Sequence, residues 1–459
     1  MIRKIGVEFE FPIVYSDGKG ADRKIIQQLW TTFSRQYPEW KPIRENIRKT
    51  VSGVTRTSGG YSEVIDTDVG VCTIEFSMRP FAHIADMNAH FLKTFQPLRD
   101  VAKELGLSIL TMGCQPITGY DWSRETQSDY YLVWDRRVTY HNLMVPIAAH
   151  QAAVDISVDE WIPVTNMLAA LSGPMIALTA SSPIFQGKKL PVKEHRAQVW
   201  DLIWERQKDP RMAEYLTNDI PHVPFANLNE YFEYLWESRM FFAENKKGVF
   251  EMLRKPTFID FLRNRRPQTG KNAKQEHMLV APEDSMLTTI ANYGWFTNKV
   301  HYFFKKTATV EGALDAYDNQ TMDDFCKKHI QFVYVENRPC GVAAKGEEMA
   351  MPSLTLGLVE NWREAATLVE QLTWNEWKSF RVDAIAYSLE FSKNKDGYLG
   401  LIKEMLYIAQ RGLKRRGLGE EAYLKPFFKR LEHRQSNADD ILATFTHNGI
   451  PGLLREHSY

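Results

Sequence analysis

Residues 5–11 read Ile-Gly-Val-Glu-Phe-Glu-Phe, and they alternate between large apolar side chains and small or acidic ones. Because successive side chains of a strand point to opposite faces, this alternation predicts a strand over residues 3–14. One face would carry Ile5, Val7, Phe9 and Phe11. The apolar face must pack on a core, so Glu8 and Glu10 would lie together on the opposite, polar face.

Three later segments divide in the same way into an apolar and a polar face, at residues 71–79, 148–157 and 330–338. In each segment a spacing of two residues groups polar side chains on one face: Glu75 with Arg79, Gln151 with Asp155, and Glu336 with Arg338. Four such strands predict an antiparallel sheet whose polar faces carry acids, amides and arginines.

The polar faces have two interpretations. In the first they are simply exposed to solvent, as one face of an antiparallel sheet often is. In the second they form a metal site, because they carry few lysines and combine carboxylates with arginine, whose guanidinium group suits phosphate. Carboxylate oxygens are preferred ligands of Mg²⁺, and converging carboxylates repel one another unless a cation lies between them. This second interpretation predicts a metal site that would also bridge nucleotide phosphates, formed by Glu8, Glu10, Glu75 and Glu336.

The rest of the chain is mostly helical in pattern. Apolar residues recur at helical spacing from Ile84 to Leu105, and Gly106 follows as a C-terminal stop. Residues 195–310 are largely helical in pattern and rich in aromatic residues, and almost everything after residue 356 is helical. We expect an α+β fold, in which an antiparallel sheet is flanked by helices and followed by a helical part. Residues 1–345 would form the catalytic domain, and residues 346–459 would pack on it or continue it.

Composition excludes some classes of protein. The 57 basic and 57 acidic residues cancel, which argues against a nucleic-acid binder, since such proteins usually carry a basic excess. No pair of cysteines has CxxC spacing, and four cysteines in 459 residues are too few for a disulfide framework: Cys72, Cys114, Cys326 and Cys340. These features predict a protein of the reducing cytoplasm.

The sequence does not predict a membrane protein. No apolar signal-peptide region follows Arg3 and Lys4. The uncharged segment Val164–Pro183 has about the length of a membrane span, but Asn166 and the Gly173-Pro174 pair interrupt it. We expect a buried helix that breaks near Gly173, and no membrane partner.

Several short motifs follow one another in a fixed order along the chain. They are Gly6-x-Glu8-x-Glu10, the segment Gly70 to Ser77, Lys103-Glu104-Leu105-Gly106, Ala149 to Ser157, Ala177 to Lys188, Arg196 to Trp200, Thr257 to Leu262, Tyr334 to Arg338, Met351 to Leu358, and Ala409 to Leu413. In this order they resemble the motifs of the glutamate–cysteine ligases of the plant and proteobacterial type. That family belongs to the glutamine-synthetase-like superfamily of carboxylate–amine ligases.

The resemblance implies a curved glutamine-synthetase-like sheet and a reaction. In this superfamily a carboxylate attacks the γ-phosphate of ATP, and an amine then displaces phosphate from the acyl phosphate to form an amide, here expected to be γ-glutamyl. The implied cofactors are ATP and Mg²⁺ or Mn²⁺, and the implied substrates are a small amino acid and an amine. Carried over residue by residue, the metal ligands would be Glu8, Glu10, Glu75 and Glu336. Gln151 would line the metal and nucleotide face, and Arg196 and Arg338 would contact phosphates or the substrate carboxylate.

Three departures from the family pattern limit the implied substrates. Ala153 replaces an asparagine, and Pro339-Cys340 replaces acidic residues. The family segment that helps shape the amino-acid pocket is not recognisable between Gly113 and Pro146. A phosphotransferase stays open beside the ligase, because the resemblance implies an architecture that also supports phosphoryl transfer to guanidino groups. A non-catalytic ligand-binding descendant also stays open, because of Ala153. His150 falls on the apolar face, which predicts a core histidine, and no Walker loop or G-x-G-x-x-G motif is present.

Overall fold

The computed structural model describes residues 2–45, 49–126, 128–136, 141–205, 221, 223–254, 256–293, 297–392 and 397–459. Within these ranges the largest element is a nine-stranded sheet with the order β14-β15-β7-β1-β5-β4-β3-β2, and β6 pairs with the far end of β1. All of its pairs are antiparallel. Its strands are β1 Ile5–Tyr15, β2 Lys41–Arg44, β3 Val51–Ser58, β4 Tyr61–Thr67, β5 Thr73–Ser77, β6 Leu107–Ile109, β7 His150–Ile156, β14 Asn298–Phe304 and β15 Ile330–Asn337. The four alternating segments thus become β1, β5, β7 and β15, and the predicted α+β class is confirmed.

The apolar face of β1 packs on helix α2 (Ile84–Glu104). The ring of Phe9 lies 5.2 Å from that of Phe91 in an edge-to-face arrangement, and Phe11 lies 5.4 Å from Phe95. Aromatic pairs at these separations add to the hydrophobic contribution of burial. The predicted helical spacing is confirmed, because the apolar residues at that spacing are the buried ones of α2. Gly106 ends the helix in the left-handed conformation, with φ of 72°.

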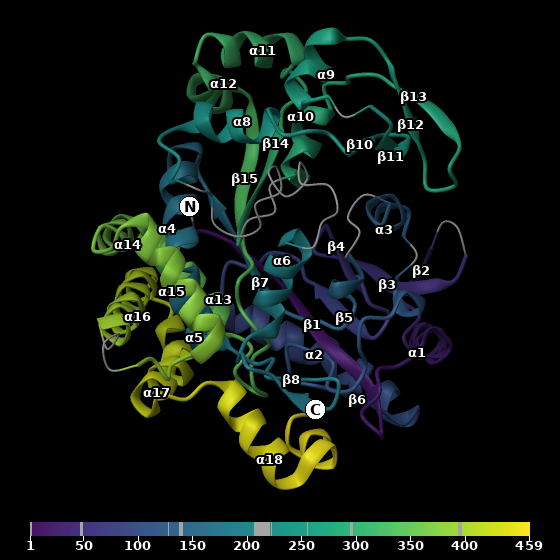
Figure 1. Ribbon diagram of the computed structural model, residues 1–459, viewed down its shortest axis with the longest axis vertical. Coiled ribbons are helices and arrows are strands. Elements are labelled where there is room, and N and C mark those ends of the chain that lie inside the picture. Colours follow the sequence, from purple (N-terminus) through teal and green to yellow (C-terminus); the bar gives the residue numbers. More distant parts are fainter. Residues whose placement is uncertain are drawn as a thin grey trace.

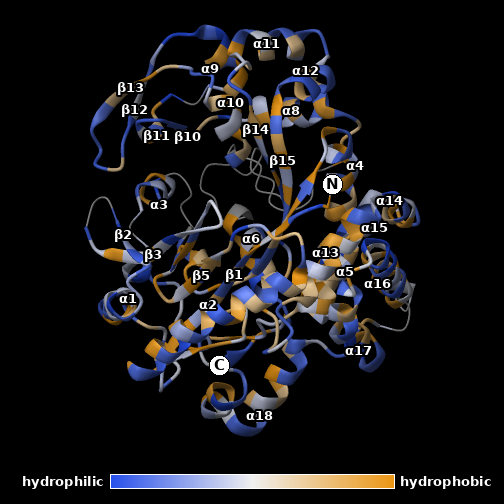
Figure 2. Ribbon diagram, turned by 180° about the vertical axis from the view of Figure 1, so that it is seen from behind, coloured by the Kyte–Doolittle hydropathy of each residue, from blue (hydrophilic) through white to orange (hydrophobic). Residues whose placement is uncertain are grey.

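Helices from later in the chain cover the same side of the sheet (Figure 1). Helix α13 contacts β7 and β1, and α4 contacts β14 and β15. Figure 2 shows hydrophobic residues gathered where α5 and α13 lie together. These helices, together with those that pack around them, are α4 Trp161–Ala170, α5 Ser172–Thr179, α13 Ala350–Glu360, α14 Trp362–Val369, α15 Trp374–Tyr387, α16 Gly397–Arg416, α17 Lys425–His433 and α18 Asn437–Glu456.

The uncharged segment Val164–Pro183 forms α4 and α5, which meet at an angle of 50° around Leu171. Every residue of α5 is buried inside the protein. Among the described residues no single helix has the length and apolar composition to cross a membrane, and only this bent pair, counted from Val158, meets both criteria together. The prediction of a buried helix with a break is confirmed.

A smaller unit lies at the top of the molecule in Figure 1. Its four-stranded sheet has the order β10-β11-β12-β13. The prediction that residues 195–310 are largely helical is wrong there, because these strands are only four or five residues long, too short for periodicity to separate them from helix. The unit contains α8 Leu228–Trp236, β10 Phe242–Asn245, β11 Gly248–Met252, α9 Phe258–Asn264, β12 Gln268–Lys271, β13 His277–Val280, α10 Met286–Thr289, α11 Val310–Asp318 and α12 Met322–His329.

A second difference concerns residues 41–67, where a β2-β3-β4 meander extends the large sheet beside helix α1 (Arg23–Gln36). Residues 59–60 form the tight turn between β3 and β4. Gly59 and Gly60 both have positive φ, 58° and 82°, as a two-residue hairpin turn requires. This meander brings β4, with Asp66, beside β5.

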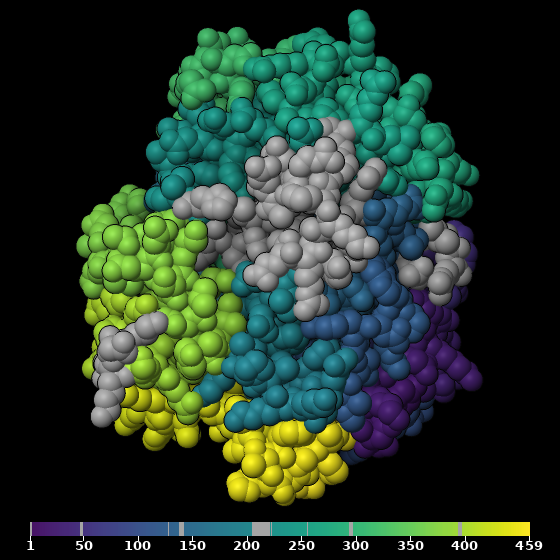
Figure 3. Space-filling view, viewed as in Figure 1, coloured from purple at the N-terminus to yellow at the C-terminus, as the bar shows by residue number. Residues whose placement is uncertain are grey.

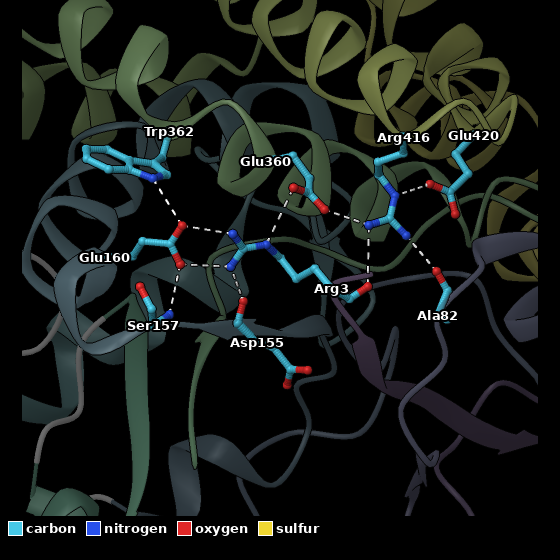
Figure 4. A network of polar contacts seen from close by, with 9 residues as sticks. All are labelled: Arg3, Ala82, Asp155, Ser157, Glu160, Glu360, Trp362, Arg416 and Glu420. Atoms are coloured by element: carbon cyan, nitrogen blue, oxygen red, sulfur yellow. Dashed lines mark hydrogen bonds and ion pairs between the residues drawn. The ribbon is translucent and has the colours of Figure 1, made fainter. Parts of the chain in front are cut away.

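A buried charge network joins the start of β1 to the C-terminal helices (Figure 4). Arg3 donates to both oxygens of Glu160, at 3.0 and 2.9 Å, and lies 3.7 Å from Glu360. Arg416 contacts Glu360 and Glu420 at 2.6 Å each, and Glu420 in turn accepts the first amide of α2. Since these acids and arginines are largely removed from water, removing one would leave its partner uncompensated.

The C-terminal helices also lie against the rest of the molecule over a long front, along the left and lower sides in Figure 3. Helix α13 shares its core with β7, and the Arg416 network reaches back to β1 and α2. We therefore propose that residues 346–459 continue the catalytic domain instead of forming a unit that folds alone.

Helices α13 and α16 cross at two glycines, which gives a test of this packing. A Cβ on Gly412 would lie 2.0 Å from the Gly357 carbonyl oxygen. Gly412→Ala should therefore lower the free energy of unfolding by about 1–3 kcal/mol, as overpacking does. Gly400→Ala, on the same helix and with no atom of the described residues within 4 Å of its added Cβ, is the control and should be neutral or stabilising. Denaturant unfolding measures both, and equal stability of the two variants would contradict the close crossing.

Candidate active site

Strand register brings the predicted acids together on the polar face of the large sheet. Glu10 on β1 lies directly opposite Glu75 on β5, and Glu75 lies opposite Asp66 on β4. On the other side of β1, Glu8 is opposite Gln151 of β7. Six of the seven predicted site residues line one cavity of about 150 Å³: Glu8, Glu10, Glu75, Gln151, Arg196 and Arg338.

The seventh predicted residue, Glu336, lines a neighbouring cavity of about 550 Å³. Glu8 belongs to both cavities and stands between them. The larger cavity is walled by aromatic side chains of β14 and β15, where Phe303 stacks on Phe332 with ring centres 4.2 Å apart. Next along the strands, His301 stacks on Tyr334 at 4.7 Å. Ala153 lies opposite both Gly6 and Glu336, and its small side chain leaves space at the base of this cavity.

Sequence reasoning missed one acid of the site. Asp68 follows β4, and its carboxylate lies with those of Glu10 and Glu75 so that one oxygen from each falls within 4.8 Å of the others. The signal was present in the alternation of residues 61–67, which places Asp66 and Asp68 two apart. Without a strand assigned there, the two aspartates could not be linked to β5.

The acids of this cluster are held in an environment that opposes their charge. Removal from water, reinforced by the nearby charge of Glu336, raises the pKa of Glu8 to about 8. Removal from water and the charge of Asp68 raise the pKa of Glu10 to about 8 as well. The pKa of Glu75 is raised well above its usual range by burial and then by Glu8. A cation placed among these groups would favour their ionised forms.

Gln151 adds an oxygen to the same place. Its side-chain amide donates to Glu10 Oε1 at 2.7 Å, while the amide of Ala149 donates to Glu10 Oε2 at 2.7 Å. The buried Oε1 of Gln151 has no hydrogen-bond partner among the described residues. Carboxylate oxygens and an unpartnered amide oxygen are the donor set of a hard divalent cation, so the residues present fit Mg²⁺ or Mn²⁺.

Glu336 differs from the other predicted metal ligands because protein side chains already contact both of its oxygens. His301 Nε2 lies 2.6 Å from its Oε2, and Arg338 forms an ion pair with its Oε1. Burial alone would raise the pKa of Glu336, but Arg338 and His301 together hold it well below its usual value. Lys299, opposite Glu336 on β14, was not predicted either, and burial lowers its pKa to about 8. Metal binding by Glu336 stays a prediction.

Arg196 and Arg338 stand on the cationic side of the smaller cavity. Arg196 lies at the start of α6 (His195–Glu205), and its guanidinium donates to the Arg338 carbonyl oxygen at 2.5 Å. The amide of Arg196 donates to Ser182 Oγ at 3.1 Å, and Glu194 accepts the amide of Ser181 at 2.7 Å. The loop between α5 and α6 thus positions the arginine that faces Glu10.

Two side chains outside the cluster behave as core groups. His150 is fully buried against Phe9, and desolvation lowers its pKa to about 3, so the predicted core histidine is confirmed. Cys340 is fully buried and lines neither of the two cavities. Burial raises the pKa of its thiol to about 12.

Comparison with known proteins shows which family the chain belongs to. Residues 4–255, more than half of the chain, match the family model described as glutamate-cysteine ligase family 2 (GCS2). The chain belongs to glutamate–cysteine ligase family 2. All of the acids of this site except Glu336 lie within the part that matches.

Individual relatives of this GCS2 protein are distant. A Frankia casuarinae protein named "Putative glutamate--cysteine ligase 2-1" is 26% identical over 142 residues, which cover 30% of this chain and 35% of that protein. A crystal structure of glutamate–cysteine ligase from Francisella tularensis in complex with AMP is 13% identical and has a TM-score of 0.55, covering 100% of this chain and 88% of the other. A bifunctional glutathione synthetase from Pasteurella multocida has 11% identity and a TM-score of 0.49, and this chain, matched over 98% of its length, spans 50% of that one. The Francisella comparison confirms the predicted fold.

The electrostatics of the acid cluster give a pH-dependent prediction. The folded-state pKa of Glu8 and Glu10 is about 8, above the value of 4.5 for a free glutamate. Their contribution to stability in the metal-free protein is thus complete below about pH 4.5 and is lost as the pH rises through 8. Mg²⁺ binds the ionised carboxylates, so it should raise the melting temperature more at pH 8 than at pH 6. Scans with Mg²⁺ and with chelator at each pH measure this difference.

Glu75→Gln is the variant that tests the assignment, since it removes one charge and keeps the shape of the side chain. It should lose most of the Mg²⁺-dependent shift, while Asp17→Asn, an exposed acid beyond β1, should keep it. An equal shift at both pH values, or an undiminished shift in Glu75→Gln, would contradict a metal site at this cluster.

Proposed function

We propose that this protein is an ATP- and Mg²⁺- or Mn²⁺-dependent ligase that joins a carboxylate to an amine, with a γ-glutamyl amide as the expected product. One observation carries the proposal: Glu8 separates two cavities of different character on a single acid-bearing face. The larger, aromatic cavity has the chemistry of a nucleotide-base site. The smaller cavity, with its acids and two arginines, has that of a site for the reacting carboxylate and amine.

The residues of the smaller cavity would bind the divalent cation and the anionic substrate groups. Glu10, Asp68 and Glu75 would hold a divalent cation, which when bound neutralises charge on phosphate and carboxylate oxygens. Arg196 and Arg338 would bind the anionic substrate groups and stabilise the charge that develops on the transferred phosphoryl group. The apolar and aromatic lining of the smaller cavity would exclude water, which would otherwise hydrolyse the acyl phosphate.

The products separate this proposal from a phosphotransferase. A ligase releases ADP and free phosphate only when an acid and an amine are both present. A kinase releases ADP and leaves a stable phosphorylated product without free phosphate. The first experiment is therefore a matrix of amino acids and amines, singly and in pairs, scored for ADP and for phosphate separately. Phosphate release with a single substrate pair supports the ligase, and ADP without phosphate contradicts it.

Glu10→Gln should lower kcat/KM of the active pair by roughly 10²-fold or more, because charge stabilisation at the phosphoryl group depends on the cation held there. Its melting temperature in chelator at pH 6 should stay close to that of the wild type, because the raised pKa keeps Glu10 protonated and uncharged there. Asp17→Asn is the matched control and should keep full activity. Full activity of Glu10→Gln would overturn the role assigned to this cluster.

The nucleotide cavity gives a separate prediction. Phe332 is 49% exposed and offers its ring to the cavity from β15. Phe332→Ala should weaken Mg²⁺·ATP binding by about 5- to 100-fold, the usual range for loss of one base-stacking ring. Leu92→Ala, an equally exposed residue on α2, should have no effect. Calorimetry measures both, and equal affinity of Phe332→Ala and the wild type would place the base elsewhere.

A further inference from the structure

Helix α3 (Asp129–Trp134) forms the roof of the smaller cavity, within the segment 113–146 that departs from the family pattern. Tyr130, Tyr131 and Trp134 all line the cavity. The hydroxyl of Tyr131 donates to Asp68 Oδ1 at 2.9 Å, so the roof is tied directly to the acid cluster. Substrate that reacts beside this cluster therefore lies under α3.

Helix α3 also packs against the four-stranded sheet. The Trp134 ring packs edge-to-face on Phe241 with centres 5.0 Å apart, and Tyr130 packs in the same way on Phe242 at 5.7 Å. Arg136, just after the helix, donates to the backbone carbonyl oxygens of Asn272 and Ala273 in the β12–β13 hairpin, at 2.9 and 2.5 Å. Because the four-stranded sheet supports α3 at several points, the height of the cavity is fixed by the fold.

Among the described residues, Lys299 joins the charged side of this cavity, and the apolar part of the lining away from the acids consists of Val69, Met144, Ile147, Trp200 and Ile203. The cavity volume of about 150 Å³ is similar to that of a cavity that accepts one benzene molecule. A ligand in this space meets carboxylates and arginines at one end and aromatic or aliphatic surface at the other.

This inference rests on the proposed function and specifies its acceptor. We propose that the acceptor is a compact primary amine whose apolar group is no larger than one aromatic ring, and that Tyr130 and Trp134 determine this specificity. The neutral amine nitrogen attacks the acyl carbon of the acyl phosphate, and the C–N bond forms as the bond from carbon to the phosphate oxygen breaks. Inorganic phosphate leaves with that electron pair and takes the proton released from nitrogen.

The test uses the donor acid found in the ADP and phosphate matrix, with benzylamine, isobutylamine, cysteine and lysine as acceptors. We expect kcat/KM for benzylamine and isobutylamine to exceed that for cysteine and lysine by about 10-fold or more, the usual discrimination of an apolar pocket. A preference for cysteine or lysine would overturn the inference and leave the ligase proposal standing.

Variants of the roof locate the specificity. Trp134→Ala and Tyr130→Ala should each raise kcat/KM for 2-naphthylmethylamine relative to benzylamine by about 10-fold. Leu132→Ala, on the same helix but outside the cavity lining, should keep the wild-type ratio. An unchanged ratio in both roof variants would overturn the assignment.

A binding measurement separates failure of the inference from failure of the proposed function. In the presence of Mg²⁺ and ATP, benzylamine should raise the melting temperature of the wild type and of Leu132→Ala but not of Tyr130→Ala. If no substrate pair turns over, this pattern still supports an amine site under α3, while the ligase proposal falls. Absence of any benzylamine shift in the wild type would overturn the inference whatever the activity.

Discussion

The feature on which this structure depends is the electrostatic repulsion among acids gathered on one sheet face. Glu10, Asp68 and Glu75 come within 4.8 Å of one another, and Glu8 stands beside them on β1. Burial raises the pKa of Glu8 and Glu10 to about 8, so the metal-free fold favours their protonated forms, and a cation placed among them would favour the ionised forms. The fold tolerates this because the opposite face of each strand is apolar and packs on α2, α4 and α13.

Two cavities of different character lie along this face of the sheet. Strands β14 and β15 supply the stacked rings of the larger cavity, together with His301 and Arg338, which hold Glu336 as an anion. Helix α3 and its supporting sheet close the smaller cavity over the acids. A ligase needs this division, because phosphoryl transfer and amide formation happen in sequence at one carboxylate but involve different partners. Membership of glutamate–cysteine ligase family 2 agrees with the arrangement without naming the acid or the amine.

Much of this arrangement could be predicted from sequence, because successive side chains of a strand point alternately to its two faces. The alternation of residues 5–11 assigned Glu8 and Glu10 to one face, and the same rule placed Glu75 and Gln151, which register then set opposite Glu10 and Glu8. The period does not say which strands are neighbours, so Asp68 beyond β4 and Lys299 on β14 were missed. Short strands such as β10 and β11 carry too few residues for a period to show. The pairing of Glu336 with His301 depends on a neighbouring strand that the sequence pattern did not reveal.

The central claim is that the acid cluster is a divalent-cation site, and titration of the protein with Mn²⁺, followed by the electron paramagnetic resonance signal of the free ion, tests it most directly. At pH 8 without nucleotide, the account predicts saturable binding in the wild type that is at least about 10-fold weaker in Glu75→Gln and unchanged in Asp17→Asn. Binding of the same affinity in Glu75→Gln, or no saturable binding in the wild type, would contradict it.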